Sequence, residues 1–193
     1  MSAVLEKALT DPPFRPLPPP ASALLRDRDT PPRLAAHLRL VHDVAVSVTA
    51  WLPTAFPAAV FDREAVLFGA ATHDIGKTVH IAELSRPGSD HEPAGEALLR
   101  SAGVEPRLAR FAGTHGSWSA PGRGLDDLLV SLADKVWKGR RQADLEQLVV
   151  DHLVAVSGQE PWQVFLRLDD HLGGLAEEAD ARLAFQNAYP IGS

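Results

Sequence analysis

Apolar residues recur at helical spacing along most of the chain, and proline and glycine divide this pattern into separate segments. Alanine and leucine abound while tyrosine occurs once, which favours helices over sheet. The predicted helices cover residues 31–52, 61–74, 91–102, 106–115, 125–138, 141–156 and 161–188. The sequence therefore predicts an all-α fold, a helical bundle in which polar side chains project into a shared cavity.

The N-terminal part of the sequence differs from the rest. It contains six prolines between positions 12 and 20 and shows little apolar periodicity. Such a composition is typical of an extended segment rather than a helix. We therefore expect residues 1–30 to form a Pro-rich arm that wraps the body or stays mobile. Residues 31–193 should form one helical domain, closed by two helices at its C-terminal end.

Composition excludes several classes of site and partner. No cysteine is present, so disulfides and thiolate metal sites are excluded, and any metal must be bound by histidine and carboxylate. The net charge of −6 argues against general nucleic-acid binding. No run of about 18 apolar residues occurs, so we expect no membrane span. The N-terminus lacks the features of a signal peptide, which suits a cytoplasmic protein.

One short stretch carries the strongest chemical signal. His73 and Asp74 follow the apolar run 66–71, and burying two polar side chains at the end of such a helix is costly unless they are paired or bind a metal. At the C-terminal turn of a helix, both side chains can face one ion. Gly76 supplies a helix stop, and Lys77 places a cation suited to a phosphate beside the pair. Considered alone, this stretch is equally compatible with a structural His–Asp pair.

Three further histidines and one aspartate occupy comparable positions. His37 lies on the apolar stripe of the first predicted helix. His91 and His115 stand at helix ends, and Asp134 interrupts a helix that is apolar on nearly every side. Each has a structural alternative, namely a hydrogen-bonded core histidine, a helix cap or a salt bridge. Together these imidazole and carboxylate groups suit Mn, Fe, Co, Ni or Zn better than Ca. They exceed the needs of one open catalytic ion, so two ions are expected.

The order His, His-Asp, Asp along this chain resembles that of the HD-domain metal-dependent phosphohydrolases. Residues 73–77 (His-Asp-Ile-Gly-Lys) match the commonest central motif of that family. His91 with a glycine four residues later, His115, and residues 132–135 (Leu-Ala-Asp-Lys) look like the branch with two metal ions. That branch includes the bacterial symmetric dinucleoside tetraphosphate hydrolases and also the HD oxygenases with a di-iron site. The resemblance covers residues 33–140.

The resemblance implies a hydrolase that cleaves a phosphate ester or anhydride of a small, nucleotide-like substrate. It also implies two divalent transition-metal ions, with Fe or Mn as the first expectation and Co, Ni, Zn or Mg as alternatives. The implied metal ligands are His37, His73, Asp74, His91, His115 and Asp134. Asp74 would bridge the two ions, and Asp74 and Lys77 are the implied catalytic residues.

Further side chains are candidates for substrate contact. Besides Lys77, the cations expected to hold phosphate charge are Lys135, Lys138 and Arg140. Trp118 could stack on a base, although an aromatic residue that fastens its loop to the core is the commoner case. His42 satisfies the spacing of the family's first ligand as well as His37 does. We prefer His37, because its helix then continues well past the ligand to Pro53, and we expect His42 to lie behind the ligands or to face the substrate.

The ligand set leaves two rival functions open. A di-iron oxygenase acting on a small polar substrate would use the same residues, and an anaerobic assay separates it from a hydrolase, which needs no oxygen. A binding module that retains metal without turnover ranks last, because no expected ligand is missing. His152 and His171 lie in polar surroundings and are expected at the surface. The oligomeric state stays open, with a homodimer among the alternatives.

Overall fold

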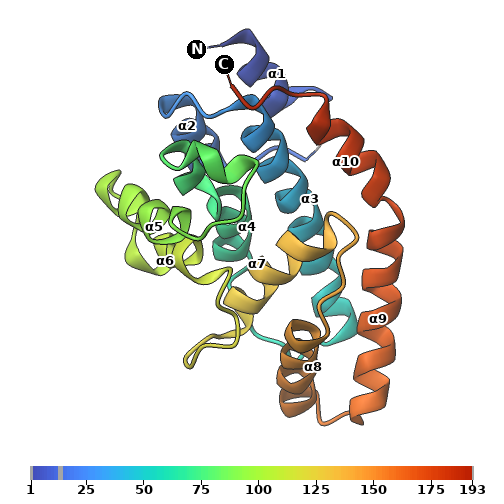
Figure 1. Ribbon diagram of the computed structural model, residues 1–193. Helices are drawn as coiled ribbons and strands as arrows, with labels where there is room; N and C mark the ends of the chain where they lie inside the picture. The colour runs from blue at the N-terminus through green and yellow to red at the C-terminus, as the bar shows by residue number, and fades with distance from the viewer. Residues whose placement is uncertain (1, 13–14, 193) are drawn as a thin grey trace.

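The computed structural model describes residues 2–12 and 15–192, and every regular element in these residues is helical. The α-helices are α1 (Ala3–Thr10), α2 (Pro19–Asp27), α3 (Pro32–Ala55), α4 (Arg63–Thr72), α5 (His91–Ser101), α6 (Pro106–Thr114), α7 (Leu125–Val136), α8 (Ala143–Ser157), α9 (Pro161–Glu177) and α10 (Ala179–Asn187). Two 3₁₀ turns, η1 (Ile75–Thr78) and η2 (Ile81–Leu84), link α4 to α5. The all-α prediction is confirmed for this part of the chain (Figure 1). Among the same residues, no helix combines the length and the apolar character that crossing a bilayer requires.

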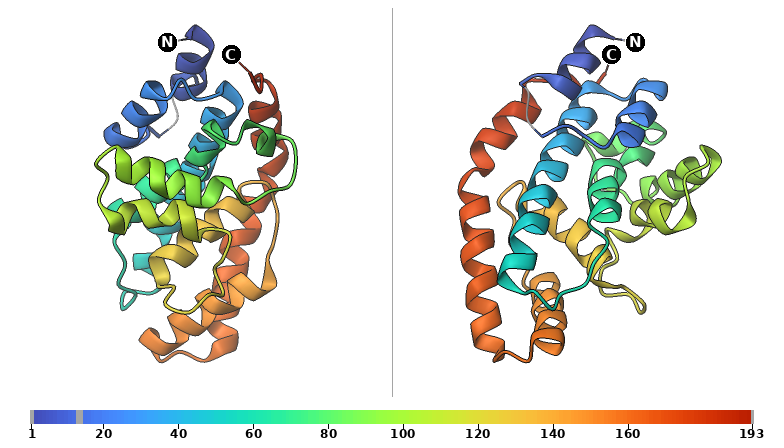
Figure 2. Two further views of the ribbon diagram at one scale, coloured as in Figure 1. Left: turned by 60° about the vertical axis from the view of Figure 1, so that its left-hand side comes forward. Right: turned by 180° about the vertical axis from the view of Figure 1, so that it is seen from behind.

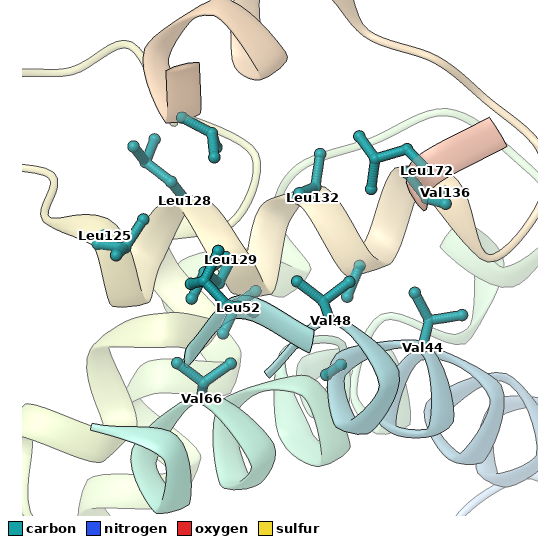
Figure 3. Close-up of a cluster of buried hydrophobic side chains, with 14 of the residues drawn as sticks. Val44, Val48, Leu52, Val66, Leu125, Leu128, Leu129, Leu132, Val136 and Leu172 are labelled. Atoms are coloured by element: carbon teal, nitrogen blue, oxygen red, sulfur yellow. The ribbon is translucent and has the colours of Figure 1, made fainter. Parts of the chain in front are cut away.

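The main hydrophobic cluster lies between α3, α4 and α7, and α9 packs over it (Figure 3). Val44, Val48 and Leu52 recur at helical spacing on α3 and are almost fully buried. They belong to one cluster with Val66 of α4 and Leu129 of α7. Burying an aliphatic side chain contributes about 1.5–3 kcal/mol. The cluster therefore fixes the mutual placement of three helices that carry candidate ligands.

Helix α3 continues beyond its expected end at about Leu52. Pro53 lies in the last turn, and the helix ends at Ala55, with the amide of Phe56 donating to the carbonyl of Leu52 at 2.7 Å. Proline lacks an amide hydrogen and so costs this turn one hydrogen bond. Leu52 and Ala55 are both buried, and packing of the final turn outweighs that loss.

The expected extended conformation of the N-terminal arm is wrong for two stretches, which form α1 and α2. On α1, Leu5, Ala8 and Leu9 follow helical spacing and are buried. Ser2 caps this helix by accepting the amide hydrogen of Val4. The prolines at the start of α2 occupy its first turn, where a missing amide removes no helical bond. Because α1 packs on α3 and α2 packs on α4, both helices join the folded body.

The segment 161–188 forms two helices rather than the single helix expected. α9 and α10 are separated at Glu178. The guanidinium of Arg182 stabilises this break, since it donates to the carbonyl of Leu175 at 2.7 Å and to that of Trp137 at 3.3 Å. It also pairs with the Glu178 carboxylate at 2.9 Å. As a result α10 lies beside α3 (Figure 2).

The two ends of the described chain meet at the start of α3 (Figure 1). Arg33 donates its amide to the carbonyl of Pro190 at 3.1 Å and its Nε to the carbonyl of Tyr189 at 2.9 Å. The Tyr189 hydroxyl in turn donates to the carbonyl of Asp11 at 3.2 Å. These bonds hold Arg33 and the end of α10 in place beside the candidate site.

The exposed location expected for His171 is wrong, because this residue is partly buried. His171 stacks on the ring of Trp51, with 4.3 Å between ring centroids and 4° between the ring planes. Burial lowers the pKa of His171. His152 on α8 is only partly exposed. His171 of α9 thus packs against α3 through the ring of Trp51.

Candidate metal centre

His73 and Asp74 stand at the C-terminal end of α4, as the sequence predicts. The amide of His73 donates to the carbonyl of Gly69 at 2.7 Å, so His73 completes the last turn. Asp74 then leaves the helix with φ −98° and ψ 11° and begins η1. This change of direction after one residue lets two neighbouring side chains face one point. Both side chains are buried, with 0% and 3% exposure.

A close backbone contact brings His91 to this pair. A Cβ atom on Gly76 would lie 1.9 Å from the carbonyl oxygen of His91 and 2.6 Å from the amide nitrogen of Gly95. Only glycine fits there, because no side-chain carbon tolerates such distances to backbone atoms. The glycine of the His-Asp-Ile-Gly-Lys stretch is therefore the contact point at which α5 docks on η1.

The six predicted metal ligands come together in the structure. Among the described residues, three groups of three side chains have ligand atoms within 4.8 Å of one another; one is His80, Glu83 and Asp90, and the other two consist of predicted ligands and share Asp74. The first of these two groups is completed by His37 and His73, and the second by His91 and His115. Asp134 adjoins the first group, with its Oδ1 3.7 Å from His37 Nε2 and 3.5 Å from His73 Nε2. The preference for His37 over His42 as the first ligand thus agrees with the geometry.

The two carboxylate oxygens of Asp74 face different groups. Oδ2 lies 3.1 Å from His37 Nε2, whereas Oδ1 lies 3.0 Å from His91 Nε2 and 3.4 Å from His115 Nε2. Asp74 Oδ1 and His91 Nε2 are buried and neither makes a hydrogen bond, although they adjoin each other. Buried polar atoms without partners are uncommon and call for a ligand. A cation bound between the two groups would satisfy both atoms.

Hydrogen bonds on the far side of three imidazoles fix their tautomers. His73 Nδ1 lies 3.0 Å from the carbonyl oxygen of Ala70, and His115 Nδ1 lies 3.1 Å from that of Ala112. His91 Nδ1 lies 2.5 Å from a carboxylate oxygen of Glu83. Because these partners only accept, each Nδ1 carries the hydrogen and each Nε2 presents a lone pair to the cluster. This is the arrangement that metal-binding histidines adopt.

The charge states of three members of the cluster also suit metal binding. Burial lowers the pKa of His73 to about 4, so its imidazole is neutral at neutral pH. Burial alone would raise the pKa of Asp74, but the surrounding histidines hold it well below its usual range. His73, Lys135 and Lys138 likewise overcome the effect of burial and keep the pKa of Asp134 low. Neutral imidazoles and ionised carboxylates are the forms that bind divalent ions. His91 differs, since burial alone would lower its pKa but Asp74 and Glu83 raise it.

The cluster opens into a cavity of about 460 Å³ that carries several cations. Lys77 and Lys135 each approach a ligand carboxylate, with Nζ 2.6 Å from Oδ2 of Asp74 and of Asp134 respectively. Lys138 also lines the cavity, and burial lowers its pKa. The cavity therefore places three lysines next to the candidate ligands, as the sequence predicts.

Three residues expected to contact substrate lie outside the cavity lining. His42 is buried on another face of α3, where burial and then the charges of three arginines lower its pKa to about 4. Trp118 donates its Nε1 hydrogen to Asp144 at 3.0 Å, which fastens its loop to α8. Arg140 is exposed beyond the turn at Gly139. The prediction of substrate contact is not supported for these three.

Several residues that line the cavity were not predicted, among them Arg33, Glu83, Glu92, Leu183 and Gln186. Arg33 precedes His37 by one helical turn, so helical spacing alone could have indicated it. Glu83 and Glu92 flank the predicted ligand His91, but no periodic pattern marks the segment that contains Glu83. Leu183 and Gln186 reach the site only because the chain breaks between α9 and α10.

No protein-family model matches this chain, and no curated protein or solved structure matches it either. The chemistry of the site must therefore be argued from its own residues. Two adjacent ligand groups share one carboxylate and lie in a cavity with basic side chains. Such a site can bind divalent cations together with an anionic ligand.

Proposed function

We propose that this protein is a metal-dependent phosphohydrolase with an HD-type dinuclear centre. Its substrate would be a phosphate ester or anhydride of a nucleotide-like compound. The observation that carries the proposal is the combination of two ligand groups sharing Asp74 with three lysines in the lining of the same cavity. Metal ligands alone serve many reactions, whereas clustered ammonium groups beside them favour a phosphate.

The donor set favours particular metals. Four imidazoles and two carboxylates, without thiolates, suit first-row transition metals. We propose Fe or Mn as the resident ions, with Co, Ni, Zn or Mg as alternatives. His37, His73 and Asp134 would hold one ion, His91 and His115 the other, and Asp74 would serve both.

The chain's own residues define how a phosphate would be held. When bound, the two ions would lower the pKa of a water molecule and offset phosphate charge. Lys77 and Lys135 already reach toward the ligand carboxylates from the cavity. With those carboxylates engaged by metal, both ammonium groups become available to phosphate oxygens. Lys138 supplies a third cation in the same cavity.

The remainder of the cavity fits an organic group. Leu34, Leu183 and Trp137 give the lining apolar surface, and Gln186 and Arg33 add polar groups. The cavity volume of about 460 Å³ falls in the range of small-molecule sites. A nucleotide combines an anionic end with a flat, largely apolar base, and the cavity lining offers both cations and apolar side chains to such a ligand.

Metal analysis followed by a phosphatase screen tests the proposal. Protein purified after growth with Mn or Fe should contain close to two ions per chain. It should release phosphate or a nucleotide from members of a panel of nucleotides and dinucleotides, both in air and without oxygen. A metal-loaded protein that converts none of the panel would contradict the proposal. Conversion of a small polar substrate only in the presence of oxygen would instead support the di-iron oxygenase alternative.

A further inference from the structure

The carboxylate of Glu83 on η2 accepts hydrogen bonds from three N–H groups at the start of α5. Its Oε1 accepts the amide of Asp90 at 3.1 Å, and its Oε2 accepts the amide of His91 at 3.2 Å. Oε2 also lies 2.5 Å from His91 Nδ1. The Glu83 side chain is 9% exposed, and a Cβ atom on Gly88 would lie 2.3 Å from its Oε1. The carboxylate is thus enclosed by the segment that leads into α5.

The position of His91 explains why it needs such a partner. His73 and His115 follow the last turns of α4 and α6, so their Nδ1 atoms reach carbonyl groups three residues earlier. His91 is the first residue of α5 and has no preceding helical turn to supply a carbonyl. An acceptor from elsewhere must therefore hold its Nδ1 hydrogen, and Glu83 provides it.

We propose that Glu83 is a positioning residue for the second metal ion, the one that Asp74, His91 and His115 would hold. This inference rests on the proposed dinuclear centre. Glu83 fixes the Nδ1–H tautomer of His91 and keeps its Nε2 directed at Asp74 Oδ1, 3.0 Å away. Within the described part of the chain, the hydrogen bonds and ion pairs of Glu83 reach none of His37, His73 and Asp134, so the ion of the first group should not depend on this carboxylate. Glu83 therefore acts selectively on one of two neighbouring ions.

A carboxylate at position 83 can accept all three hydrogen bonds, whereas an amide cannot. All three groups that approach Glu83 are N–H donors. An amide at this position would turn an NH₂ group toward at least one of them, leaving donors opposed and a buried bond unmade. A glutamine can keep its oxygen on His91 by turning its NH₂ group toward the amide of Asp90, so Glu83→Gln should disturb His91 less than Glu83→Ala does.

Cobalt titration of the metal-free full-length chain, followed by visible absorption and by metal analysis, tests the inference. Wild type should bind two Co²⁺ ions. In Glu83→Ala the second ion should bind about 10–100-fold more weakly, because loss of an outer hydrogen-bond partner has that effect, while the first keeps its affinity. Glu83→Gln should show a smaller decrease for the same ion. Glu96→Gln is the matched control, because it removes the same charge from α5 at a residue that lies outside the cavity lining and pairs with Arg100 at 3.8 Å. It should leave both affinities unchanged.

Other outcomes overturn the inference in distinguishable ways. Equal weakening of both ions, or unchanged affinity for both with only a lower melting temperature, would reduce Glu83 to a cap for α5. A wild type that binds no Co²⁺ would overturn this inference and the proposed function together. Selective loss of the second ion in a protein without phosphatase activity would support the role of Glu83 and contradict only the proposed function.

Discussion

The two halves of the ligand cluster are held in place by different means. His37, His73 and Asp134 come from α3, α4 and α7, whose large apolar side chains interdigitate in the main cluster. His91 and His115 come from the α5–α6 hairpin, whose apolar side chains also enter the core clusters but whose closest approaches to the rest of the protein are at two glycines. Gly76 lies against α5, and a Cβ on Gly69 would lie 2.6 Å from the ring of Phe111 on α6.

This difference teaches how each half should respond to change. A core of interdigitated side chains loses stability gradually as methyl groups are removed, because neighbouring side chains adjust in part. A backbone contact at glycine has no such tolerance, since any added carbon clashes at once. We therefore expect the first half to be robust and the second to be sensitive to small substitutions. Asp74 belongs to both halves, so replacing it should affect both.

Replacing the shared residue should have the largest effect. Asp74→Asn keeps the size of the side chain but removes the charge that faces His37 on one side and His91 on the other. Both ions should be lost or strongly weakened, and turnover should fall below detection. Metal analysis and a phosphatase assay check this result. Retention of two ions at wild-type affinity would show that the two groups do not share a carboxylate.

Removing Lys77 should impair turnover while leaving both halves intact. Loss of an interaction with developing phosphate charge commonly lowers the rate about 10²–10³-fold, so Lys77→Ala should show that decrease with unchanged metal content. Lys77→Arg should restore only part of the lost rate, because the planar guanidinium group of arginine does not replace a compact ammonium group. Lys7→Ala, at an exposed lysine of α1, is the control. If kcat/KM of Lys77→Ala stayed near wild type, the oxygenase alternative would become the leading one.

A single methyl group added at Gly76 should affect the His91 and His115 half of the cluster more than the other half. Gly76→Ala places a carbon against backbone atoms of α5, and overpacking of this kind commonly costs about 1–3 kcal/mol of unfolding free energy. The second ion should be lost before the first. Urea unfolding and metal titration measure the two effects.

The control for Gly76→Ala is Gly173→Ala. Gly173 lies on α9, where an added Cβ would meet nothing within 4 Å. Alanine there should be neutral or stabilise the helix by about 0.5–1 kcal/mol. If both variants behaved alike, the glycine contact would not be what positions α5.

The sequence predicts the first half better than the second. Apolar periodicity locates α3, α4 and α7, and it places His37 and Asp134 on them, because a buried stripe needs no knowledge of the partner helix. For His91 the sequence indicates only a helix start. The contact of Gly76 with α5 and the three donors around Glu83 exist only in the folded chain. No local pattern records them.

Two errors in the predicted fold have the same kind of cause. Prolines dominate the first thirty residues and obscure the spacing of Leu5, Ala8 and Leu9, which does indicate α1. The break between α9 and α10 depends on Arg182 bonding to carbonyls that include that of Trp137, 45 residues earlier. Tertiary contacts of this sort override local helical preference. They also bring α10 to the cavity, which explains why Gln186 was missed.

The smallest expected effect separates the two histidines of α3. His42 is buried outside the metal cluster, and burial, followed by the charges of Arg15, Arg63 and Arg39, lowers its pKa to about 4 from the 6.5 of an exposed histidine. Below pH 6.5 the unfolded chain takes up a proton at His42 that the folded chain refuses until about pH 4. Stability from this residue is therefore complete above that window and is lost as the pH falls through it.

His42→Leu tests this account without touching the ligands. Between about pH 6.5 and 5, wild type should lose about 1–2 kcal/mol more unfolding free energy than the variant, because each unit of pKa difference corresponds to about 1.4 kcal/mol. Metal content at neutral pH should equal that of wild type, whereas His37→Ala should lower it. Urea unfolding at several pH values and metal analysis provide both measurements. Parallel pH profiles would show that His42 titrates alike in the folded and unfolded chains, and loss of metal in His42→Leu would move the first ligand from His37 to His42.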